Sequence, residues 1–398
     1  MLTTPSGRPR ARALGIPLEG EPGPNNAVTD VAGVEVGYAT LIRGQGPLVV
    51  GSGPVRTGVT AILPRGRAGA ARGVFAQMFS LNGNGELTGS HWAAEVGRCD
   101  GPITLTNTHS VGLAHDATIR WILERGGLGE FILPVAGETW DGWLNDINGF
   151  HITELDVFAA LDSAAGGPIE EGSVGGGTGM VYYGFKGGSG TASRRVALAG
   201  GDFVLGAFVQ ANFGLRQQLT IAGVPVGRAL MDWAPEARPG PADGAESGSI
   251  IVVLATDAPL LPHQLGRLAR RASLGVGRGG AISGHGSGDI FIAFSIANQE
   301  ALDTPADVVA AARFVPDPAL GSLFAAVIES VDEAILNALV ANESMTGIDD
   351  RVIHALPHDE VRRIMRLEEA GGWRPPRGWR NDGRARSEGA AARPDTSA

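Results

Sequence analysis

The sequence predicts an α/β fold, and three observations indicate it. Short runs of β type alternate with Gly-rich turns early in the chain, and segments with helical periodicity and further apolar runs follow. The chain is 43% hydrophobic over 398 residues, which is enough to bury a large core. Its 61 glycines are spread along the chain and indicate many tight turns and close backbone approaches.

The elements follow in chain order. Between residues 25 and 125 the pattern predicts strands at 34–36, 59–63, 73–78 and 103–107, and one short helix at 90–96. Regularly spaced apolar residues predict a further helix at 152–161. Further strands are predicted at 203–209, 250–254 and 289–296. Further helices are predicted at 261–272, 320–339 and 357–367, and the second has apolar residues along one face throughout.

Three segments lack such patterns. Residues 1–24 are rich in Pro, Gly and Arg and are predicted to form an irregular arm. Residues 234–248 contain three prolines and no apolar period, which predicts a flexible linker directly before the buried-type run SIIVVLAT. Residues 370–398 carry arginines without a hydrophobic pattern, and we expect disorder there.

Composition excludes several classes of protein. With 32 basic and 42 acidic side chains the net charge is −10, and no basic stripe is present, so we expect no nucleic-acid or membrane partner. No apolar run approaches the roughly 18 residues of a membrane span, and no apolar segment follows the first twelve residues, so a cytoplasmic location is expected. Cys99 is the only cysteine and is interpreted as a small buried side chain. Lys186 is the only lysine, and no P-loop motif occurs.

Common catalytic templates are also missing. Neither G-x-S-x-G nor H-E-x-x-H occurs. His354 and His358 have the i, i+4 spacing of a metal pair, but Pro357 lies between them and a capping or solvated role is preferred. A G-x-G-x-x-G match at 275–280 follows a predicted helix and precedes a strand, which is the reverse of a dinucleotide site. We therefore expect neither a metal nor a cofactor.

Four polar stretches remain, and all lie at predicted strand ends or turns, where side chains from several strands can converge on one cleft. They are Gly248-Ser249, residues 284–289 (GHGSGD), residues 210–214 (QANFG) and residues 138–146 (ETWDGWLND). Each alone is also compatible with side chains that hydrogen-bond their own backbone within a turn.

Together these stretches resemble the L-aminopeptidase/D-esterase family of self-processing aminopeptidases, which includes the β-peptidyl aminopeptidases. The resemblance covers about residues 25–368 through ordered blocks: NNAVTDVAGVEVG at 25–37, GVTAILP at 58–64, LNGNGELTG at 81–89, TNTHSVG at 106–112, ETWDGWLNDING at 138–149, GGGTGM at 175–180, QANFG at 210–214, GSIIVVL at 248–254, GHGSGDIF at 284–291 and SMTG at 344–347.

The resemblance implies a four-layer αββα sandwich similar to the N-terminal nucleophile hydrolases. It places self-cleavage at Gly248-Ser249, which divides a single domain into a fragment 25–248 that follows the arm and a fragment 249–369 that precedes the tail. It also implies the site residues: Ser249 as nucleophile, Ser287 and Asp289 as the pair that orients it, Asn212 as oxyanion donor and Glu138 as partner of the substrate's amino group. The implied substrates are small peptides, amino-acid amides or esters, and the implied assembly is a homotetramer of cleaved pairs.

The residue chemistry agrees with these roles. After cleavage Ser249 would carry its own α-amine, whose pKa of about 7.7–8.0 suits a general base near neutral pH. Glycine at 248 tolerates the backbone geometry that presents its carbonyl to the hydroxyl. A side-chain amide such as that of Asn212 can stabilise an oxyanion by about 3–4 kcal/mol.

One position departs from the family pattern. Relatives carry a tyrosine two residues after the glutamate matched by Glu138, whereas this chain has Trp140. An indole N–H donates but cannot accept a hydrogen bond. Trp140 either donates to the oxyanion from a shifted position or forms a wall that narrows the cleft, and the wall is preferred.

Other functions remain as alternatives. The same fold could hydrolyse pantetheine-like or nylon-oligomer-like amides, or transfer the acyl group to an amine in place of water. An inactive binding homologue is disfavoured because Ser249, Ser287, Asp289 and Asn212 are all present. A cofactor-dependent oxidoreductase is disfavoured further.

Overall fold

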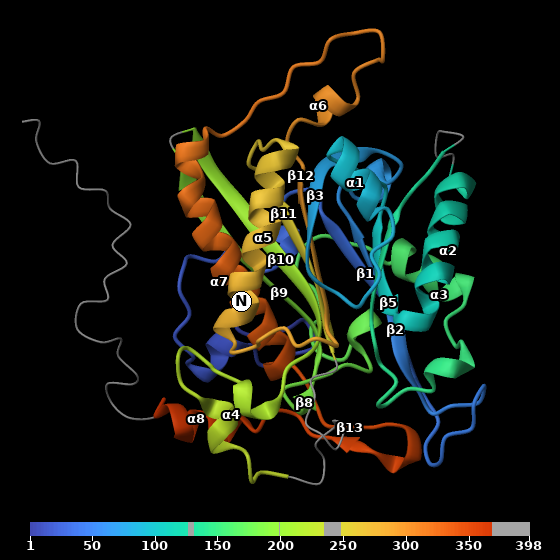
Figure 1. The fold of residues 1–398 in the computed structure, drawn as a ribbon, viewed down its shortest axis with the longest axis vertical. Coiled ribbons are helices and arrows are strands. Elements are labelled where there is room, and N and C mark those ends of the chain that lie inside the picture. Colours follow the sequence, from blue (N-terminus) through green and yellow to red (C-terminus); the bar gives the residue numbers. More distant parts are fainter. Residues whose placement is uncertain (126–130, 199, 235–247, 368–398) are drawn as a thin grey trace, which may run out of the picture.

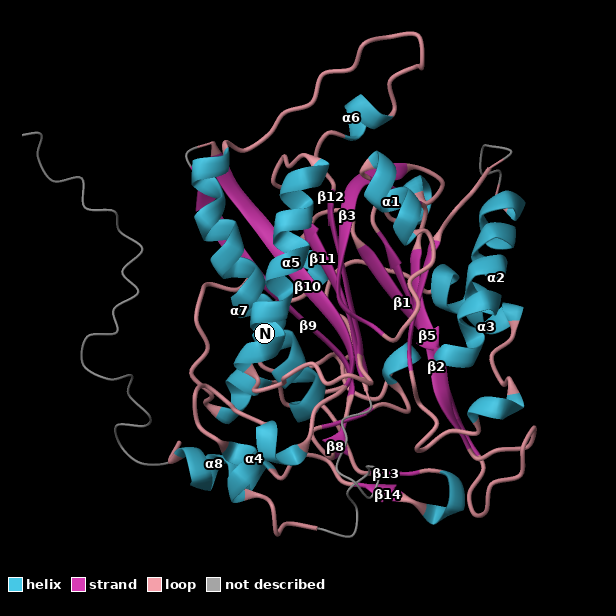
Figure 2. Cartoon of the chain, in the orientation of Figure 1, coloured by secondary structure: helices cyan, strands magenta, loops and turns pink. Residues whose placement is uncertain are grey.

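Two β-sheets pack face to face, and helices cover the outer face of each (Figure 1). A computed structural model describes residues 1–125, 131–198, 200–234 and 248–367 of the chain. Helices α5 and α7 lie on one side of the sheet pair and α2 and α3 on the other, so the layers run α, β, β, α (Figure 2). This confirms the four-layer sandwich expected from the sequence.

The larger sheet has six strands and supplies most of the candidate site. Its strands β11 and β12 are parallel, and all its other neighbours are antiparallel. In spatial order they are β4 (Arg98–Asp100), β3 (Gly73–Gly83), β12 (Gly288–Ser295), β11 (Ser249–Thr256), β10 (Gly201–Asn212) and β9 (Gly188–Leu198).

The smaller sheet has four strands, of which β5 and β6 are parallel. Its spatial order is β1 (Glu35–Arg43), β2 (Val55–Leu63), β5 (Ile103–Asn107) and β6 (Val135–Thr139). Two short hairpins stand apart from both sheets: β7 (Val181–Tyr182) with β8 (Phe185–Lys186), and β13 (Met345–Thr346) with β14 (Val352–Ile353).

The helices of the described chain include a counterpart of every predicted helix, and three more besides. They are α1 (Ser90–Val96), α2 (Val111–Glu124), α3 (Glu154–Asp162), α4 (Val226–Ala229), α5 (Pro262–Arg278), α6 (Gln299–Leu302), α7 (Gly321–Val340) and α8 (His358–Met365). The sequence did not predict helix α2, nor strands β4, β6 and β9 of the two sheets. It also did not resolve the short α4 and α6, which are one turn each.

Strand β11 shows why its sequence is apolar without alternation. Ile250 and Val252 face the core under α5 and α7, whereas Ile251 and Val253 face the core between the two sheets. A strand that is buried on both faces reads as one continuous hydrophobic run. This double burial fixes the first residue of the strand, Ser249, at a rigid position.

Two glycines of the G-x-G-x-x-G match have structural roles in and after helix α5. A Cβ on Gly275 would lie 2.7 Å from the Cβ of Val331, so glycine allows α5 to approach α7 closely. Gly280 follows the end of α5 with φ of +94°, a conformation that favours glycine.

The N-terminal segment is irregular apart from a 3₁₀ turn, η1 (Ala11–Leu14), but it does not stand away from the molecule as an arm would. Ala11 and Leu14 are buried in the core that α5 and α7 cover. The Arg10 side chain is buried as well, and its Nε lies 2.6 Å from a carboxylate oxygen of Glu171. Residues 1–24 are therefore part of the packed domain.

The predicted linker and tail fall almost wholly on positions 235–247 and 368–398, which lie outside the described residues. Among the helices that the structure describes, none combines the length and apolar character needed to cross a membrane.

Candidate active site

Three strand ends meet at Ser249. Ser249 is the first residue of β11, and it pairs with Asn212, the last residue of β10, and with Gly288, the first residue of β12. Because β11 and β12 are parallel and β10 is antiparallel to β11, all three reach the same edge of the sheet. The ladder therefore places Asn212 on one side of Ser249, and Ser287 and Asp289 on the other.

The peptide bond before Ser249 is held in this ladder. The N–H of Gly288 donates a hydrogen bond of 3.1 Å to the carbonyl oxygen of Gly248. A Cβ on Gly248 would lie 2.4 Å from the Asn212 carbonyl oxygen and 2.7 Å from the Cα of Phe213, and both are backbone atoms. Only glycine fits at this position without displacing strand β10 or its continuation.

Ser287 and Asp289 form a buried pair. The Ser287 hydroxyl donates to Oδ1 of Asp289 at 2.6 Å, and the two residues are 0% and 1% exposed. The second oxygen of Asp289, Oδ2, is buried and has no hydrogen-bond partner in the described chain. Burial raises the pKa of Asp289, and the bond from Ser287 lowers it in part. Ionisation of Asp289 would place a negative charge beside the start of β11.

The Asn212 carboxamide has a fixed orientation. The backbone N–H of Val181 donates to its Oδ1 at 2.8 Å. With Oδ1 occupied as the acceptor, the amide group Nδ2 is the donor end of this side chain. A donor held next to Ser249 is what stabilisation of an oxyanion requires.

The smaller sheet contributes a carboxylate. Glu138 lies near the end of β6, and Thr108 follows β5; these two strands are parallel and end at the same edge. The Thr108 hydroxyl donates to Oε2 of Glu138, and the backbone N–H of Glu86 donates to Oε1 at 3.0 Å. Glu138 is only 3% exposed, and burial raises its pKa against the lowering effect of those two hydrogen bonds. A cationic ligand would stabilise the ionised form.

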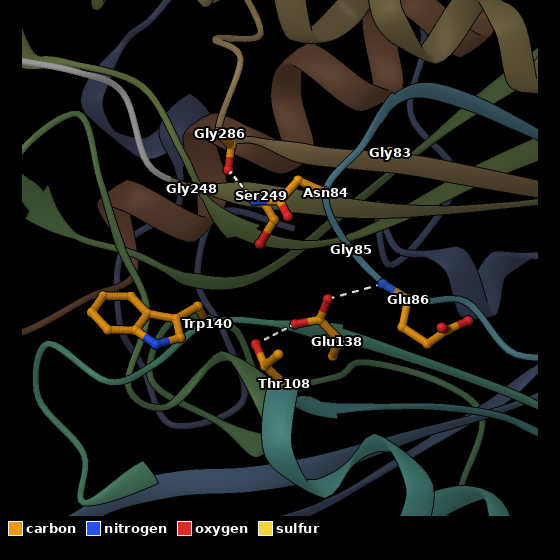
Figure 3. A pocket seen from close by; sticks show the side chains of 10 residues that line it. All are labelled: Gly83, Asn84, Gly85, Glu86, Thr108, Glu138, Trp140, Gly248, Ser249 and Gly286. Carbon is orange, nitrogen blue, oxygen red and sulfur yellow. Dashed lines mark hydrogen bonds between the residues drawn. The ribbon is translucent and has the colours of Figure 1, made fainter. Parts of the chain in front are cut away.

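A cavity of about 480 Å³ lies between the two sheets at this edge. Ser249 and Glu138 come from opposite sheets and point into the same space (Figure 3). The lining residues are Gly83, Asn84, Gly85, Glu86, Thr108, Glu138, Trp140, Gly248, Ser249 and Gly286. Asn212, Ser287 and Asp289 are not among them, because they lie beside Ser249 within the sheet rather than on the cavity surface.

Trp140 lies at one side of this cavity, with its indole turned away from Glu138 (Figure 3). The side chain is half exposed, and its ring lies over Gly142, where an added Cβ would be 2.6 Å from two indole carbons. The structure therefore places Trp140 on the lining of the cavity.

The sequence did not predict several other residues of the site. Asn82 donates through Nδ2 to the carbonyl oxygens of Ser283 and Gly284, at 2.7 and 2.9 Å, and Asn84 donates to Gly286 at 2.8 Å. These amides, which follow each other at the end of β3, hold the turn that carries Ser287. Their signal was the polar run after a predicted strand, and Thr108 occupies a similar position after β5.

The remaining candidates lie elsewhere. Cys99 is buried, and burial raises its pKa to about 12, so it is not a nucleophile near neutral pH. His358 donates through Nε2 to the carbonyl of Val340, while the His354 ring packs edge-on against Trp233. In the part of the chain that is described, no group of three or more His, Cys, Asp or Glu side chains could hold a metal ion.

Comparisons with known proteins show the family of this chain. The model of peptidase family S58 matches residues 26–353. The β-peptidyl aminopeptidase BapA of Sphingosinicella microcystinivorans is 49% identical over 366 residues, 90% of this chain and 92% of that protein. The enzyme of the same name from Sphingosinicella xenopeptidilytica is 47% identical over 367 residues, 90% of this chain and 91% of that protein.

Solved structures give the same result. The L-aminopeptidase D-Ala-esterase/amidase of Ochrobactrum anthropi, described as a prototype of the serine aminopeptidases and a variant of the Ntn hydrolase fold, superposes with a TM-score of 0.83 at 48% identity over 91% of this chain and 99% of that one. A Burkholderia β-aminopeptidase superposes with a TM-score of 0.80 at 43% identity over 92% of this chain and 100% of that one. The resemblance, the fold class and the peptidase activity expected from the sequence are confirmed. The chain therefore belongs to peptidase family S58, the aminopeptidases with an Ntn-hydrolase type of fold that its sequence resembles.

Proposed function

We propose that this peptidase cleaves its own Gly248-Ser249 bond and then releases N-terminal residues from small peptides, amides or esters with Ser249 as nucleophile. The observation that carries the proposal is the placement of Ser249. It begins a strand buried on both faces, opens onto the cavity, and follows a glycine whose carbonyl is already hydrogen-bonded by Gly288.

In the self-cleavage step, the Ser249 hydroxyl attacks the carbonyl carbon of Gly248. The C–N bond breaks, an ester forms on Oγ, and the nitrogen of Ser249 becomes a free amine. Water then hydrolyses the ester and releases Gly248 as a carboxylate. The Gly288 N–H supports this step because it is positioned to stabilise the negative charge that develops on the Gly248 oxygen.

In the peptidase reaction, the new α-amine takes the proton of the Ser249 hydroxyl as it attacks the substrate carbonyl. Asn212 donates through Nδ2 to the oxyanion. The hydrogen bond from the Val181 N–H to Oδ1 supports that role, because it fixes the orientation of the side-chain amide. The Ser287-Asp289 pair orients Ser249, and its carboxylate stabilises the ammonium that forms once the amine has taken the proton. The amine returns the proton to the leaving group, and water resolves the acyl-enzyme.

We propose that Glu138 selects substrates with a free amino group. Its buried carboxylate faces Ser249 across the cavity, so a bound ammonium would hold the scissile carbonyl near the nucleophile. Trp140 forms a wall that favours small residues such as glycine or alanine. The names of the Sphingosinicella relatives make β-peptides the first substrates to assay, and the Ochrobactrum enzyme adds D-alanine esters.

The test is the intact mass of the purified protein. Wild type should give two species, residues 1–248 and 249–398, and Ser249→Ala should remain one chain of 41.0 kDa. Ser295→Ala is the matched control, because Ser295 is a buried serine of the neighbouring strand that donates to the Ala258 carbonyl instead of facing the cavity. It should process normally. Cleavage of Ser249→Ala at the same bond would refute self-processing.

We further propose that the cleaved pairs assemble as a homotetramer, as the family resemblance implies, and that the enzyme is cytoplasmic. Light scattering during size exclusion should then give about four times the mass of one chain. A mass of one or two chains would refute the tetramer.

A further inference from the structure

Lys186, the only lysine of the chain, is fully buried at the end of β8. Its Nζ donates to the carbonyl oxygens of Met180 at 3.0 Å and of Gly187 at 2.7 Å. Burial, and secondarily the charge of Arg8, lower the pKa of Lys186 to about 7. An amine and an ammonium can both supply the two hydrogens that these carbonyls accept. Burial of such a polar group costs free energy, so its presence in the core points to a role beyond packing.

The peptide unit between Met180 and Val181 connects Lys186 to the site. Its carbonyl oxygen accepts from Lys186 Nζ, and its N–H donates to Oδ1 of Asn212 at 2.8 Å. The unit is planar, so the two hydrogen bonds leave it in opposite directions along one rigid group. The Met180 side chain is fixed as well, since the Thr139 hydroxyl lies 2.9 Å from its sulfur.

This arrangement strengthens Asn212 as a donor. A donor on the Met180 carbonyl polarises the peptide and makes the Val181 N–H more positive. That N–H then draws electron density toward Oδ1 of Asn212, which makes the Nδ2 hydrogens better donors. Hydrogen bonds in such a chain reinforce one another by roughly 10–30% each.

We propose that Lys186 is a positioning residue that sets the orientation and donor strength of Asn212 through the Met180-Val181 peptide. The proposal rests on the oxyanion role assigned to Asn212 above. The backbone N–H of Gly187 also donates to the Met180 carbonyl, at 2.9 Å. Loss of the Lys186 amine should therefore loosen the Met180-Val181 peptide, which the Gly187 N–H still holds in part.

The first test is a double-mutant cycle with alanine p-nitroanilide, with rates expressed per processed chain as measured by intact mass. Lys186→Met should lower kcat about ten-fold and change KM less than two-fold, because the effect arises in the transition state. In an Asn212→Ala background the same substitution should have no further effect. An unchanged kcat, or an equal loss in both backgrounds, would overturn the proposal.

The control is Arg56→Met. Arg56 is also a buried cation whose guanidinium donates to backbone carbonyls, those of Arg43, Gly44, Val55 and Thr346. Its loss should lower Tm but leave kcat within two-fold. If Asn212→Ala itself keeps full kcat, the assigned oxyanion role fails, and that outcome is distinct from a failure confined to Lys186.

A second measurement does not require processing. In the uncleaved Ser249→Ala chain, hydrogen exchange of the Val181 amide should accelerate several-fold when Lys186→Met is added, and should not accelerate with Arg56→Met. This comparison tests the role of Lys186 even where a variant fails to self-cleave, because it uses the uncleaved chain. Equal protection of Val181 with and without the amine would overturn the proposal.

Discussion

Replacing Glu138 by glutamine should remove most of the enzyme's preference for a free substrate amine. Glutamine keeps the size of the side chain, and its oxygen can still accept from either the Glu86 N–H or the Thr108 hydroxyl, so the cavity should be preserved. Two unit charges about 4 Å apart attract by about 4 kcal/mol at an effective dielectric constant near 20. Desolvation of the ammonium offsets part of this. A net loss of about 2–3 kcal/mol corresponds to roughly 30–150-fold in kcat/KM.

The assay compares alanine p-nitroanilide with its N-acetyl form. Wild type should strongly prefer the free amine, and Glu138→Gln should bring the two rates within a few-fold by lowering kcat/KM for the free amine. Glu86→Gln is the control, because Glu86 also lines the cavity but its side chain is exposed. Exposed charges contribute about 1 kcal/mol or less, so this variant should lose less than about five-fold. Equal effects of the two substitutions, or an unchanged preference in Glu138→Gln, would refute the selection by Glu138.

Three further outcomes are expected. Trp140→Phe should keep most of kcat because the indole acts as a wall, whereas Asn212→Ala should lose about 10²-fold or more; equal losses would make the indole N–H catalytic. As pH falls, kcat/KM should first decline as the α-amine, the general base, is protonated, with an ordinary pKa of about 7.7–8.0. It should decline a second time through the raised pKa values of Glu138 and Asp289, whose ionised forms are the active ones; this second decline should lie above pH 4.5, the ordinary value for glutamate, and a second decline below it would contradict this. Gly248→Ala should slow the appearance of the two fragments in a mass time course, because its Cβ would lie 2.4 Å from a backbone oxygen; normal processing would contradict the tight fit.

The sequence predicted the elements whose apolar residues follow a clear period. Helix α7 lies within one residue of the predicted 320–339, and α1 matches 90–96. Helix α2 was missed because its buried face is formed largely by small residues, Ala114, Ala117 and Thr118, which give a weak hydrophobic pattern. Its periodicity becomes clear only with Trp121 and Ile122 near its end.

Strand β9 was missed for a different reason. Its first residues, GSGTAS, read as a loop, yet they are buried between β10 and α7. A Cβ on Gly190 would lie 2.0 Å from the carbonyl oxygen of Ala334, so the small residues are what allows α7 to approach the sheet. Tertiary packing, rather than local propensity, makes this segment a strand.

The candidate site divides in the same way. Ser249, Asn212 and Asp289 could be anticipated because they lie at strand ends, and the pairing of β10, β11 and β12 brings their backbones together. The partners of these residues could not be anticipated. Val181 contacts Asn212 from 31 positions earlier, and Thr108 contacts Glu138 from 30 positions earlier, through folding that no local pattern records.

The hydrogen bond from Gly288 to the Gly248 carbonyl is one of two features that keep the precursor inactive. Before cleavage Ser249 has no free amine, and Gly248 fills the acyl position because its carbonyl oxygen accepts the hydrogen bond from the Gly288 N–H. In the proposed mechanism the uncleaved chain is a zymogen, and the inhibiting group is its own covalently attached first substrate. In the proposed cleavage, ester formation on Ser249 frees the amine, and hydrolysis of that ester then releases the Gly248 carboxylate from the acyl position. Activity should therefore appear in step with loss of the full-length chain and without a later activation phase.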